Sequence, residues 1–429
     1  MKAEKKAATK RTKNPPKVVF LPPQKKMTMI PFSPPRIDEA TVAEVTAALT
    51  SGWITTGPRV KKLEEQLAAY CCISNVLCVS SNSAGLELML RWFGVGAGDE
   101  VIVPAYTYCA TANVVVHCGA RPVLVDVGDD FCVNVEAVRR AITPRTKVIM
   151  PVDLGGLPCD YDELNALVRE PAMVAKFTPN TDEQRRLGRI LVLADAAHSI
   201  GAKYKGKAAG SLTDLSVFSF HAVKNLTTAE GGAICLNLPE TFDNEQLYKR
   251  LRIMSLHGQS KDAFAKTQIG NWRYDVTEAG FKCNMTDVLA AIGLVELQRY
   301  DSENLPKRKW IFDTYSAAFA KYPQFNVPVY ETADKTSSYH LYLLRINNIT
   351  EEERDKIIQR ISEQEVSVNV HYLPLPMLSF YKNEGYNIGD YPVTYRNYAC
   401  EITLPVYYDL TPEQVETVIQ AVMNAVVQK

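Results

Sequence analysis

Short apolar runs alternate with amphipathic stretches along the middle of the chain. The runs are predicted to be strands at Val76–Val79, Glu100–Val103, Arg121–Asp126, Thr146–Val152, Ile190–Ala194, Asp214–Phe220 and Gly232–Leu236. The stretches between them carry apolar residues at helical spacing. This alternation predicts an α/β fold, in which helices cover both faces of a mainly parallel sheet.

Helices are also predicted on both sides of this region. Two precede it, at Asp38–Leu49 and Arg59–Tyr70, and a long one ends at Leu297. The polar residues Asn284–Asp287 lie where the long helix begins, and we expect them to cap its first turn. The segment Gly52–Pro58 is predicted to be the loop between the first two helices.

The pattern beyond Pro306 predicts a smaller α/β unit. Its helices are expected at Lys307–Ala320, Glu351–Gln364 and Pro412–Val427, and its strands at Tyr339–Leu344 and Val366–His371. A chain of 429 residues is long enough for one large or two medium domains. We therefore expect a large domain at residues 30–290 and a small C-terminal domain at residues 291–429.

Two stretches of the large domain are predicted to be irregular. Tyr248–Lys282 is polar and contains three glycines, so we expect it to be mostly loop. Ala166–Arg189 is long and polar, and we interpret it as a surface insertion.

The first 29 residues differ from the rest of the chain. Met1–Met29 holds nine Lys and Arg against the single acid Glu4, together with two Pro-Pro pairs, so we expect it to be disordered. Such a tail could bind nucleic acid or a lipid surface. It carries no apolar h-region of the kind a signal peptide has and no amphipathic period, which favours a solvated tail, or an upstream extension if Met27 or Met29 is the true start.

Composition excludes several classes of function. Lys and Arg number 48 and Asp and Glu number 48, so the net charge does not indicate a nucleic acid or membrane partner. The ten cysteines lack metal-ligand spacing, and no metal site is expected. We expect these thiols to be reduced and the protein to be cytoplasmic.

Lys224 is the residue around which the candidate chemistry is organised. It follows the apolar run Val217–Phe220 and precedes the glycines Gly231 and Gly232. An apolar setting disfavours the ammonium form, so such a lysine can attack a carbonyl and form a Schiff base. The alternative is a surface lysine on a turn after a strand.

Asp195 lies at the carboxyl end of a predicted buried strand, 29 residues before Lys224. Ligand chemistry in open α/β sheets takes place at that end of the strands. A carboxylate there could hold the protonated pyridine nitrogen of pyridoxal phosphate. Taken alone, Asp195 could equally be a helix cap.

Two further stretches could hold other parts of such a cofactor. Asn82, Ser83 and Ala84 begin a helical pattern directly after a strand, and helix N-termini bind phosphate, although the same residues are ordinary caps. Tyr108 follows another strand and could stack on a ring, or could be a core aromatic.

Seven motifs in order resemble the nucleotide-sugar aminotransferases, the DegT/DnrJ/StrS group of fold-type I pyridoxal-phosphate enzymes. They are Ile30–Ser33, Ser51–Pro58, Gly98–Pro104, Asp195–His198, Phe218–Lys224, Ala229–Gly232 and Phe281–Thr286. The chain most resembles members that aminate C4 of a keto-sugar, such as the enzyme making UDP-4-amino-4-deoxy-arabinose. Gly155–Pro158 departs from the family, which more often has an aromatic before the glycine.

The resemblance implies a function and a role for each residue. An amino group would pass from glutamate, leaving 2-oxoglutarate, to a nucleotide-linked 4-keto-sugar for polysaccharide or related amino-sugar biosynthesis. Lys224 and Asp195 would be catalytic. The other implied cofactor-binding residues are Ser83, Ala84, Tyr108, His198, Ser219 and Asn284. The family's Asn284 counterpart reaches the neighbouring subunit's cofactor, which implies a homodimer with shared sites, and the loop at 52–58 would border the sugar nucleotide.

Two alternative functions are compatible with the same fold. A keto-sugar dehydratase resembles this chain but has histidine in place of the Schiff-base lysine, and Lys224 argues against it. A cofactor-binding regulator without turnover would not need the complete set of Lys224, Asp195 and Ser219. Turnover with glutamate separates the regulator from an enzyme.

Overall fold

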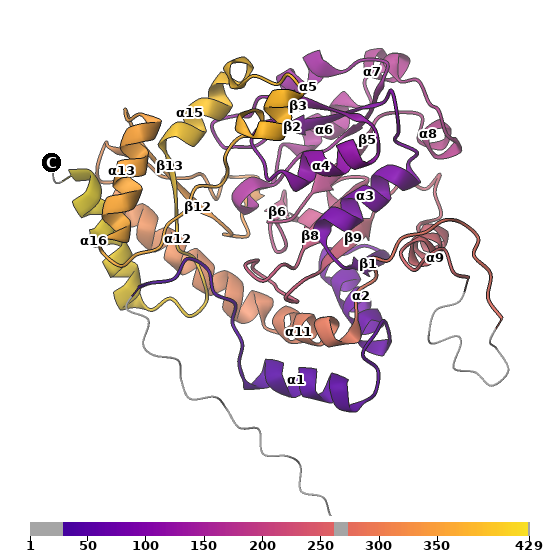
Figure 1. Cartoon of the computed structure of the whole chain (residues 1–429), viewed down its shortest axis with the longest axis horizontal. Coiled ribbons are helices and arrows are strands. Elements are labelled where there is room, and N and C mark those ends of the chain that lie inside the picture. Colours follow the sequence, from indigo (N-terminus) through magenta and orange to yellow (C-terminus); the bar gives the residue numbers. More distant parts are fainter. Residues whose placement is uncertain (1–28, 261–272, 428–429) are drawn as a thin grey trace, which may run out of the picture.

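The computed structural model describes residues 29–260 and 273–427 (Figure 1). The predicted disorder of Met1–Met29 therefore falls, apart from Met29, outside the described residues. Among the described residues, no helix has both the length and the apolar character needed to cross a bilayer.

A seven-stranded sheet forms the centre of the molecule, in the order β1-β9-β8-β5-β4-β2-β3. Six strands run in one direction and β9 runs against them, which confirms the mainly parallel sheet. The strands are β1 Asn75–Val79, β2 Glu100–Pro104, β3 Arg121–Val125, β4 Thr146–Ile149, β5 Leu191–Asp195, β8 Leu215–Ser219 and β9 Gly232–Leu236. All seven predicted strands are present, although β4 ends three residues earlier than expected.

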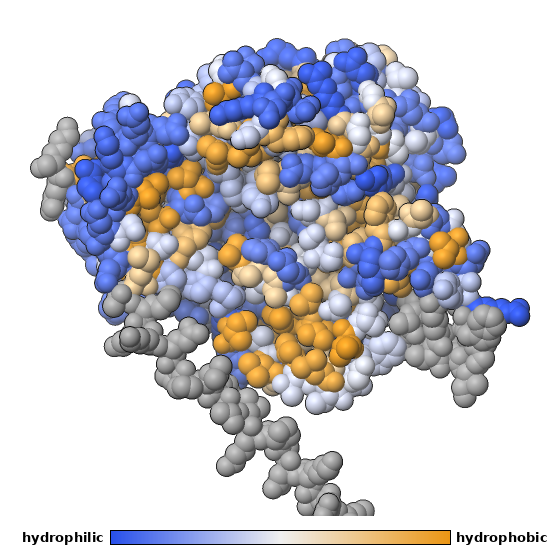
Figure 2. All heavy atoms as spheres, in the orientation of Figure 1, coloured by the Kyte–Doolittle hydropathy of each residue, from blue (hydrophilic) through white to orange (hydrophobic). Residues whose placement is uncertain are grey.

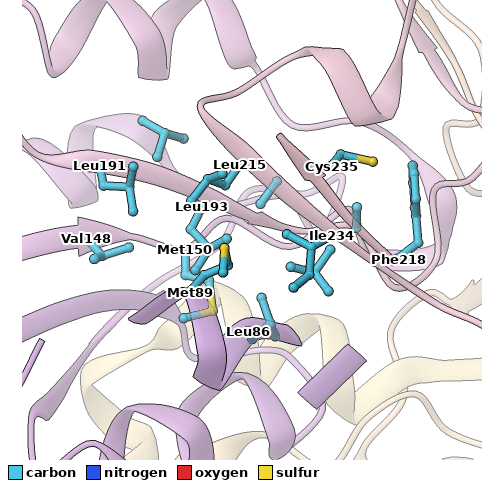
Figure 3. Packing of buried hydrophobic residues seen from close by; sticks show 14 of the residues in the cluster. Leu86, Met89, Val148, Met150, Leu191, Leu193, Leu215, Phe218, Ile234 and Cys235 are labelled. Carbon is cyan, nitrogen blue, oxygen red and sulfur yellow. The ribbon is translucent and has the colours of Figure 1, made fainter. Parts of the chain in front are cut away.

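The strands form because their apolar runs are buried on both faces. Every residue of β5, β8 and β9 is buried. In Figure 3, Leu86 and Met89 of α3 (Asn82–Trp92) lie among side chains of β4, β5, β8 and β9. Gly85 lets α3 approach the sheet, because an added Cβ would lie 2.6 Å from Val217. The core thus fixes the start of α3 beside the ends of these strands.

Helices surround this sheet and complete the first core. They are α1 Glu39–Thr50, α2 Pro58–Cys71, α3, α4 Ala110–His117, α5 Val135–Ala141, α6 Tyr161–Leu167, α7 Pro171–Lys176, α8 Asp182–Leu187, α9 Asn244–Met254 and α11 Asp287–Gln298. A small second sheet pairs β6 Lys203–Tyr204 with β7 Lys207–Ala208 and β11 Lys335–Thr336.

A separate core lies beyond residue 300. The sheet β10-β12-β13 packs with helices around buried Tyr315, Leu344 and Val418. Its elements are α12 Leu305–Phe319, β10 Phe325–Asn326, β12 Tyr342–Ile346, α13 Glu351–Ser362, α15 Pro392–Cys400, β13 Glu401–Leu404 and α16 Pro412–Val427. The short helix α14 Ser379–Asn383 lies in the same part of the chain, but it packs through Tyr381 against the first core. The smaller α/β unit is therefore present, and the division between residues 290 and 291 stays a prediction.

The expected strand at Val366–His371 is wrong. This segment makes only single bridges, from Val366 to Ile30 and from Asn369 to Thr403. Side chains take the donors that a longer ladder would need. The N–H of Val370 donates to the side chain of Asn369 at 2.8 Å, and the N–H of His371 donates to Glu401 at 3.1 Å.

Two polar stretches are more ordered than the sequence indicates. The described residues of Tyr248–Lys282 are mostly loop, as expected, but the first of them, up to Met254, continue helix α9, which buries Leu247, Leu251 and Met254. Residues 261–272 lie outside the described residues. The expected surface insertion at Ala166–Arg189 carries α7 and α8 and buries Gln184, whose amide donates to the carbonyl of Phe93 at 2.9 Å. It is thus packed onto the large core.

The cap of α11 lies within the expected segment Asn284–Asp287, but not at Asn284. The N-cap residue is Thr286, and its side chain makes no capping hydrogen bond. Asn284 lies two residues earlier and is therefore free of the capping role.

Candidate active site

The chemistry-bearing residues gather at the carboxyl ends of neighbouring strands. Asp195 is the last residue of β5, and Ser219 is the last residue of β8. Lys224 follows β8 in a turn closed by its N–H, which donates to the carbonyl of His221 at 2.9 Å. This edge of the sheet is where open α/β folds bind ligands.

Asp195 is a buried carboxylate held by neutral donors. Its Oδ1 accepts from the side-chain amide of Asn82 at 3.1 Å and from the N–H of Ala197 at 3.2 Å. Its Oδ2 accepts from the hydroxyl of Thr111 at 2.8 Å. Burial raises the pKa of Asp195, against these hydrogen bonds and the charge of Lys224. A cation at this position would therefore be stabilised strongly.

Lys224 is a partly buried amine in an electrostatically unfavourable setting. Burial lowers its pKa to about 8, although the charge of Asp195 acts in the opposite direction. A larger fraction of free amine is then present near neutral pH than for an ordinary lysine. This confirms no role by itself, but the chemical requirement for a nucleophilic lysine is met.

The first turn of α3 lies beside Asp195 and Ser219. Its N-cap is Ser81, whose hydroxyl accepts from the N–H of Ala84 at 3.1 Å. Ser83 and Ala84 are both partly exposed in this turn. Gly232, paired with Ser219, lets β9 approach closely, because an added Cβ would lie 2.6 Å from the backbone of Ser81 and Asn82.

His198 is a neutral imidazole whose tautomer follows from its contacts. Its Nδ1 accepts from the N–H of Gly155 at 3.2 Å, so the proton is on Nε2, which lies 3.1 Å from the hydroxyl of Tyr372. Burial and the charge of Lys224 hold the pKa of His198 well below its usual value. The Gly155 turn thus contacts the site directly, although it departs from the family pattern.

His340 joins the second unit to the lysine turn. Its Nδ1 lies 2.8 Å from Oδ1 of Asn225, the residue after Lys224, and its ring centroid is 4.3 Å from that of His198. The amide nitrogen of Asn225 donates to the carbonyl of Ser338 at 2.6 Å. Asn225 Oδ1 therefore accepts the proton of His340 Nδ1, and Nε2 of His340 carries a lone pair.

His371 adds a third imidazole from the same unit. Its ring stacks on Phe32 at 5.3 Å between centroids, and its Nδ1 lies 2.9 Å from the hydroxyl of Thr403. Burial and the charge of Lys224 lower the pKa of His371 to about 3. His198, His340 and His371 are therefore all uncharged, and the charge of Lys224 helps to lower the pKa of each.

Tyr108 lies at the open side of this group. Its side chain is 57% exposed, and its ring centroid is 5.4 Å from that of Tyr372. The core-aromatic interpretation is therefore wrong, and the ring is available to a ligand.

Asn284 is not brought together with the other predicted residues. Its backbone bridges to Val79 at the end of β1, but its side chain donates to the hydroxyl of Thr56 at 2.6 Å and accepts from Lys282 at 2.5 Å. It lines a cleft of about 430 Å³ shared with α2 and α9 rather than the turn that holds Lys224.

The sequence missed several residues of the site. Asn82 and Thr111 contact Asp195 from more than 80 positions away, and His340, His371 and Tyr372 come from the second unit. His340 and His371 each lie next to apolar residues in the sequence, and this position was the signal that could have marked them as candidate site residues.

These residues fit pyridoxal phosphate. Within the part of the chain that the structure describes, Lys224 is the one cation whose charge acts on the buried carboxylate of Asp195. The Lys224 amine is partly neutral near pH 7. At Gly232, β9 approaches the backbone of Ser81 and Asn82 so closely that a side chain would not fit, which leaves the start of α3 shaped as a cradle for a phosphate. Within residues 29–260 and 273–427, no three His, Cys, Asp or Glu side chains are grouped as metal ligands would be.

Comparison with known proteins also indicates an aminotransferase. The model of the DegT/DnrJ/EryC1/StrS aminotransferase family matches residues 35–175 and 182–423. The chain is 34% identical over 411 residues to the spore coat polysaccharide biosynthesis protein SpsC of Bacillus subtilis, covering 94% of this chain and 98% of that protein.

Solved structures are similar over nearly the whole chain. A protein of Streptococcus pneumoniae, described as a candidate sugar aminotransferase and solved in its PMP form, is 46% identical with a TM-score of 0.89, covering 92% of this chain and 98% of that one. The aminotransferase TlmJ of Streptoalloteichus hindustanus is 30% identical with a TM-score of 0.81, covering 93% and 99%. With its fold, its lysine and its buried aspartate in the matched region, the chain belongs to the DegT/DnrJ/EryC1/StrS aminotransferase family.

Proposed function

We propose that this chain transfers the amino group of glutamate to a nucleotide-linked 4-keto-sugar. Its broader class, a sugar aminotransferase that depends on pyridoxal phosphate, follows from the family. The single observation that carries the assignment is the placement of Lys224 in the turn after β8, next to the neighbouring strand β5 that ends at the buried Asp195.

Asp195 would hold the cofactor's ring nitrogen. The cofactor, when bound, supplies an electron sink for the carbon that loses its proton. That sink requires a protonated ring nitrogen, and the Asp195 carboxylate stabilises this positive charge in a setting from which water is excluded. Asn82 and Thr111 fix the two carboxylate oxygens, so the charge is oriented before the cofactor arrives.

Lys224 would bind the cofactor and then move a proton. Burial lowers the pKa of the Lys224 amine to about 8, so near neutral pH its Nζ would be able both to accept and to release a proton. Such a group can take a proton from the donor's carbon and return it elsewhere near neutral pH. His198 and His371 are uncharged, so they place no further positive charge near Lys224. The proton transferred in the reaction would therefore be carried by the Lys224 amine.

The remaining residues would position the cofactor. Ser83 and Ser219 supply hydroxyls, and the first N–H groups of α3 supply donors for a phosphate. Ala84 belongs to the same turn, but its N–H is shared with Ser81. Tyr108 would stack on the ring, and His198 would donate from Nε2 near the ring's phenolic oxygen.

A second copy of the chain would complete the site. Helix α11 is apolar on nearly all sides, yet Leu289, Ile292 and Val295 are only partly buried. Figure 2 shows apolar side chains gathered over α1 and α11, and Leu49 and Ile54 are more than half exposed. A helix apolar all round is normally covered. We propose a homodimer in which Asn284 reaches the cofactor phosphate of the neighbouring subunit.

The sugar substrate and its place in the cell follow from similar reasoning. The relative SpsC is named for spore coat polysaccharide biosynthesis, which supports a role in making an amino-sugar for a polysaccharide. The resemblance to C4-aminating enzymes favours C4 of the sugar. All ten cysteines are free thiols, which supports a reducing compartment such as the cytoplasm.

The test is turnover with a panel of substrates. Purified protein loaded with pyridoxal phosphate is mixed with glutamate and UDP-, GDP- or dTDP-linked 4-keto-sugars, and 2-oxoglutarate and the amino-sugar are measured. Borohydride reduction followed by mass spectrometry should place the cofactor on Lys224. An adduct on another lysine, or absence of turnover of glutamate with every keto-sugar of the panel, would overturn the proposal.

A further inference from the structure

Asp287 is a completely buried carboxylate outside the catalytic group. It is the first residue of α11, and its side chain accepts two backbone donors of another helix. Oδ1 accepts from the N–H of Val60 at 3.0 Å, and Oδ2 accepts from the N–H of Arg59 at 3.1 Å. The N-cap of α2, Gly57, has no side chain to do this. Asp287 therefore caps α2 from a distant part of the chain.

The approach of Asp287 depends on Gly57. A Cβ added there would lie 2.8 Å from Oδ2 of Asp287. The carboxylate thus occupies the space in which an ordinary cap residue would place its own side chain.

The same two segments are joined by further hydrogen bonds. The N–H of Asp287 donates to the carbonyl of Thr55 at 3.0 Å. The hydroxyl of Thr56 donates to the carbonyl of Met285 at 2.5 Å and accepts from the amide of Asn284 at 2.6 Å. Residues 55–60 and 284–287 therefore form one hydrogen-bonded unit, with Asn284 at one end and Asp287 at the other.

We propose that Asp287 is a positioning residue that fixes Thr56, and through it the Asn284 amide, for the cofactor site of the neighbouring subunit. The inference rests on the proposed function, in which Asn284 acts across the dimer. Without the carboxylate, the buried N–H of Val60 and the partly buried N–H of Arg59 lose their acceptor, which is a costly arrangement. The chain at residues 55–60 would then shift to find new partners, and Asn284 would lose the hydroxyl that orients it.

Asp287→Asn keeps the shape but loses the charge and one acceptor. We expect cofactor retention in the variant to fall by about tenfold, because the partner's Asn284 amide would no longer be oriented to donate to the phosphate. Thr56→Val is the second variant, since it removes the hydroxyl that orients Asn284 and leaves both Asp287 bonds to α2 in place. It should show the same kind of defect even if Asp287→Asn is poorly folded.

Subunit mixing distinguishes positioning across the dimer from a general loss of structure. Asp287→Asn chains and, separately, Thr56→Val chains are mixed with Lys224→Ala chains. The mixture of Asn284→Ala with Lys224→Ala is the reference. In the mixed dimer, one site combines the intact Lys224 with the intact Asn284 and Asp287 of the Lys224→Ala chain. Activity should recover to about a quarter of the wild-type value after random exchange, because half of the dimers hold one working site in two.

Each outcome decides the question. Recovery of both mixtures, and of the Thr56→Val mixture, supports the inference. If activity recovers only in the Asn284→Ala mixture, with subunit exchange demonstrated, the inference is overturned. Asp287 would then act only within its own subunit. Failure of the Asn284→Ala mixture overturns both the shared site and the inference, whereas wild-type turnover with glutamate leaves the enzymatic assignment standing.

Discussion

The hydroxyl of Thr111 donates to Oδ2 of Asp195 at 2.8 Å, although 84 residues separate the two in the chain. Thr111 also lies 2.9 Å from the hydroxyl of Thr107, so its donor direction is fixed from a second side. Asp195 is therefore held in place before any ligand binds. A carboxylate oriented in this way stabilises a charge without first having to reorganise.

Replacing this charge should remove most of the activity. Asp195→Asn keeps the size of the side chain but cannot stabilise a protonated ring nitrogen. We expect kcat to fall by roughly 100-fold or more, as for other charge stabilisers in buried sites. The matched control is Glu230→Gln, the same change at an exposed carboxylate near the lysine turn. Near-normal turnover of Asp195→Asn would assign the role to another residue.

Capture of pyridoxal phosphate by the cofactor-free protein should follow the titration of Lys224. Only the neutral amine reacts, and burial lowers its pKa to about 8. The rate, measured by stopped-flow absorbance, should therefore rise with pH through about 8 and then level off. Because the charge of Asp195 raises the pKa of Lys224, Asp195→Asn should move the midpoint to lower pH. A rate still rising above pH 10 would indicate an ordinary solvated lysine.

A methyl group at Gly232 should damage the phosphate cradle. The added Cβ would lie 2.6 Å from backbone atoms of Ser81 and Asn82, which cannot turn aside as a side chain would. We expect Gly232→Ala to weaken cofactor binding by at least about tenfold, or roughly 1.4 kcal/mol, in equilibrium titrations. Gly96→Ala is the control, since nothing lies within 4 Å of its added Cβ. Equal cofactor affinity of the two variants would contradict the cradle.

A charge on the partly buried face of α11 should separate the subunits. Ile292→Lys places an ammonium where the proposed partner would cover it, and burying an unpaired charge is costly. Sedimentation should then show monomers with reduced cofactor retention. Val329→Lys introduces the same charge at a half-exposed position of the second unit and should leave the dimer intact. A dimer unaffected by Ile292→Lys would place the interface elsewhere.

The sheet and its catalytic edge could be predicted because their signals are local. Each strand is a short apolar run, and Asp195 and Ser219 end two of them, so their common edge follows from parallel pairing. Helix α9 could also have been found, since Leu247, Leu251 and Met254 recur at helical spacing among the polar residues. The glycines that follow it hid this pattern.

The remaining parts of the site depend on contacts between distant segments. Asn82 on α3 and Thr111 on α4 reach Asp195 at the end of β5 only after both helices have packed against the sheet. The segment Val366–His371 has the composition of a strand, but the side chains of Asn369 and Glu401 take two of its donors. His371 consequently lies in an irregular segment against Phe32, which no local pattern indicates.

The contact of Gly232 with Ser81 and Asn82 also limits how related chains can diverge. The hydroxyl of Ser219 can be replaced by another small donor, and Tyr108 by another ring, without moving the backbone. Every residue other than glycine at position 232 introduces a Cβ into a space already occupied by main-chain atoms. Among descendants of a common ancestor that still bind the cofactor, we expect this glycine to be exchanged later than the residues that touch the ligand.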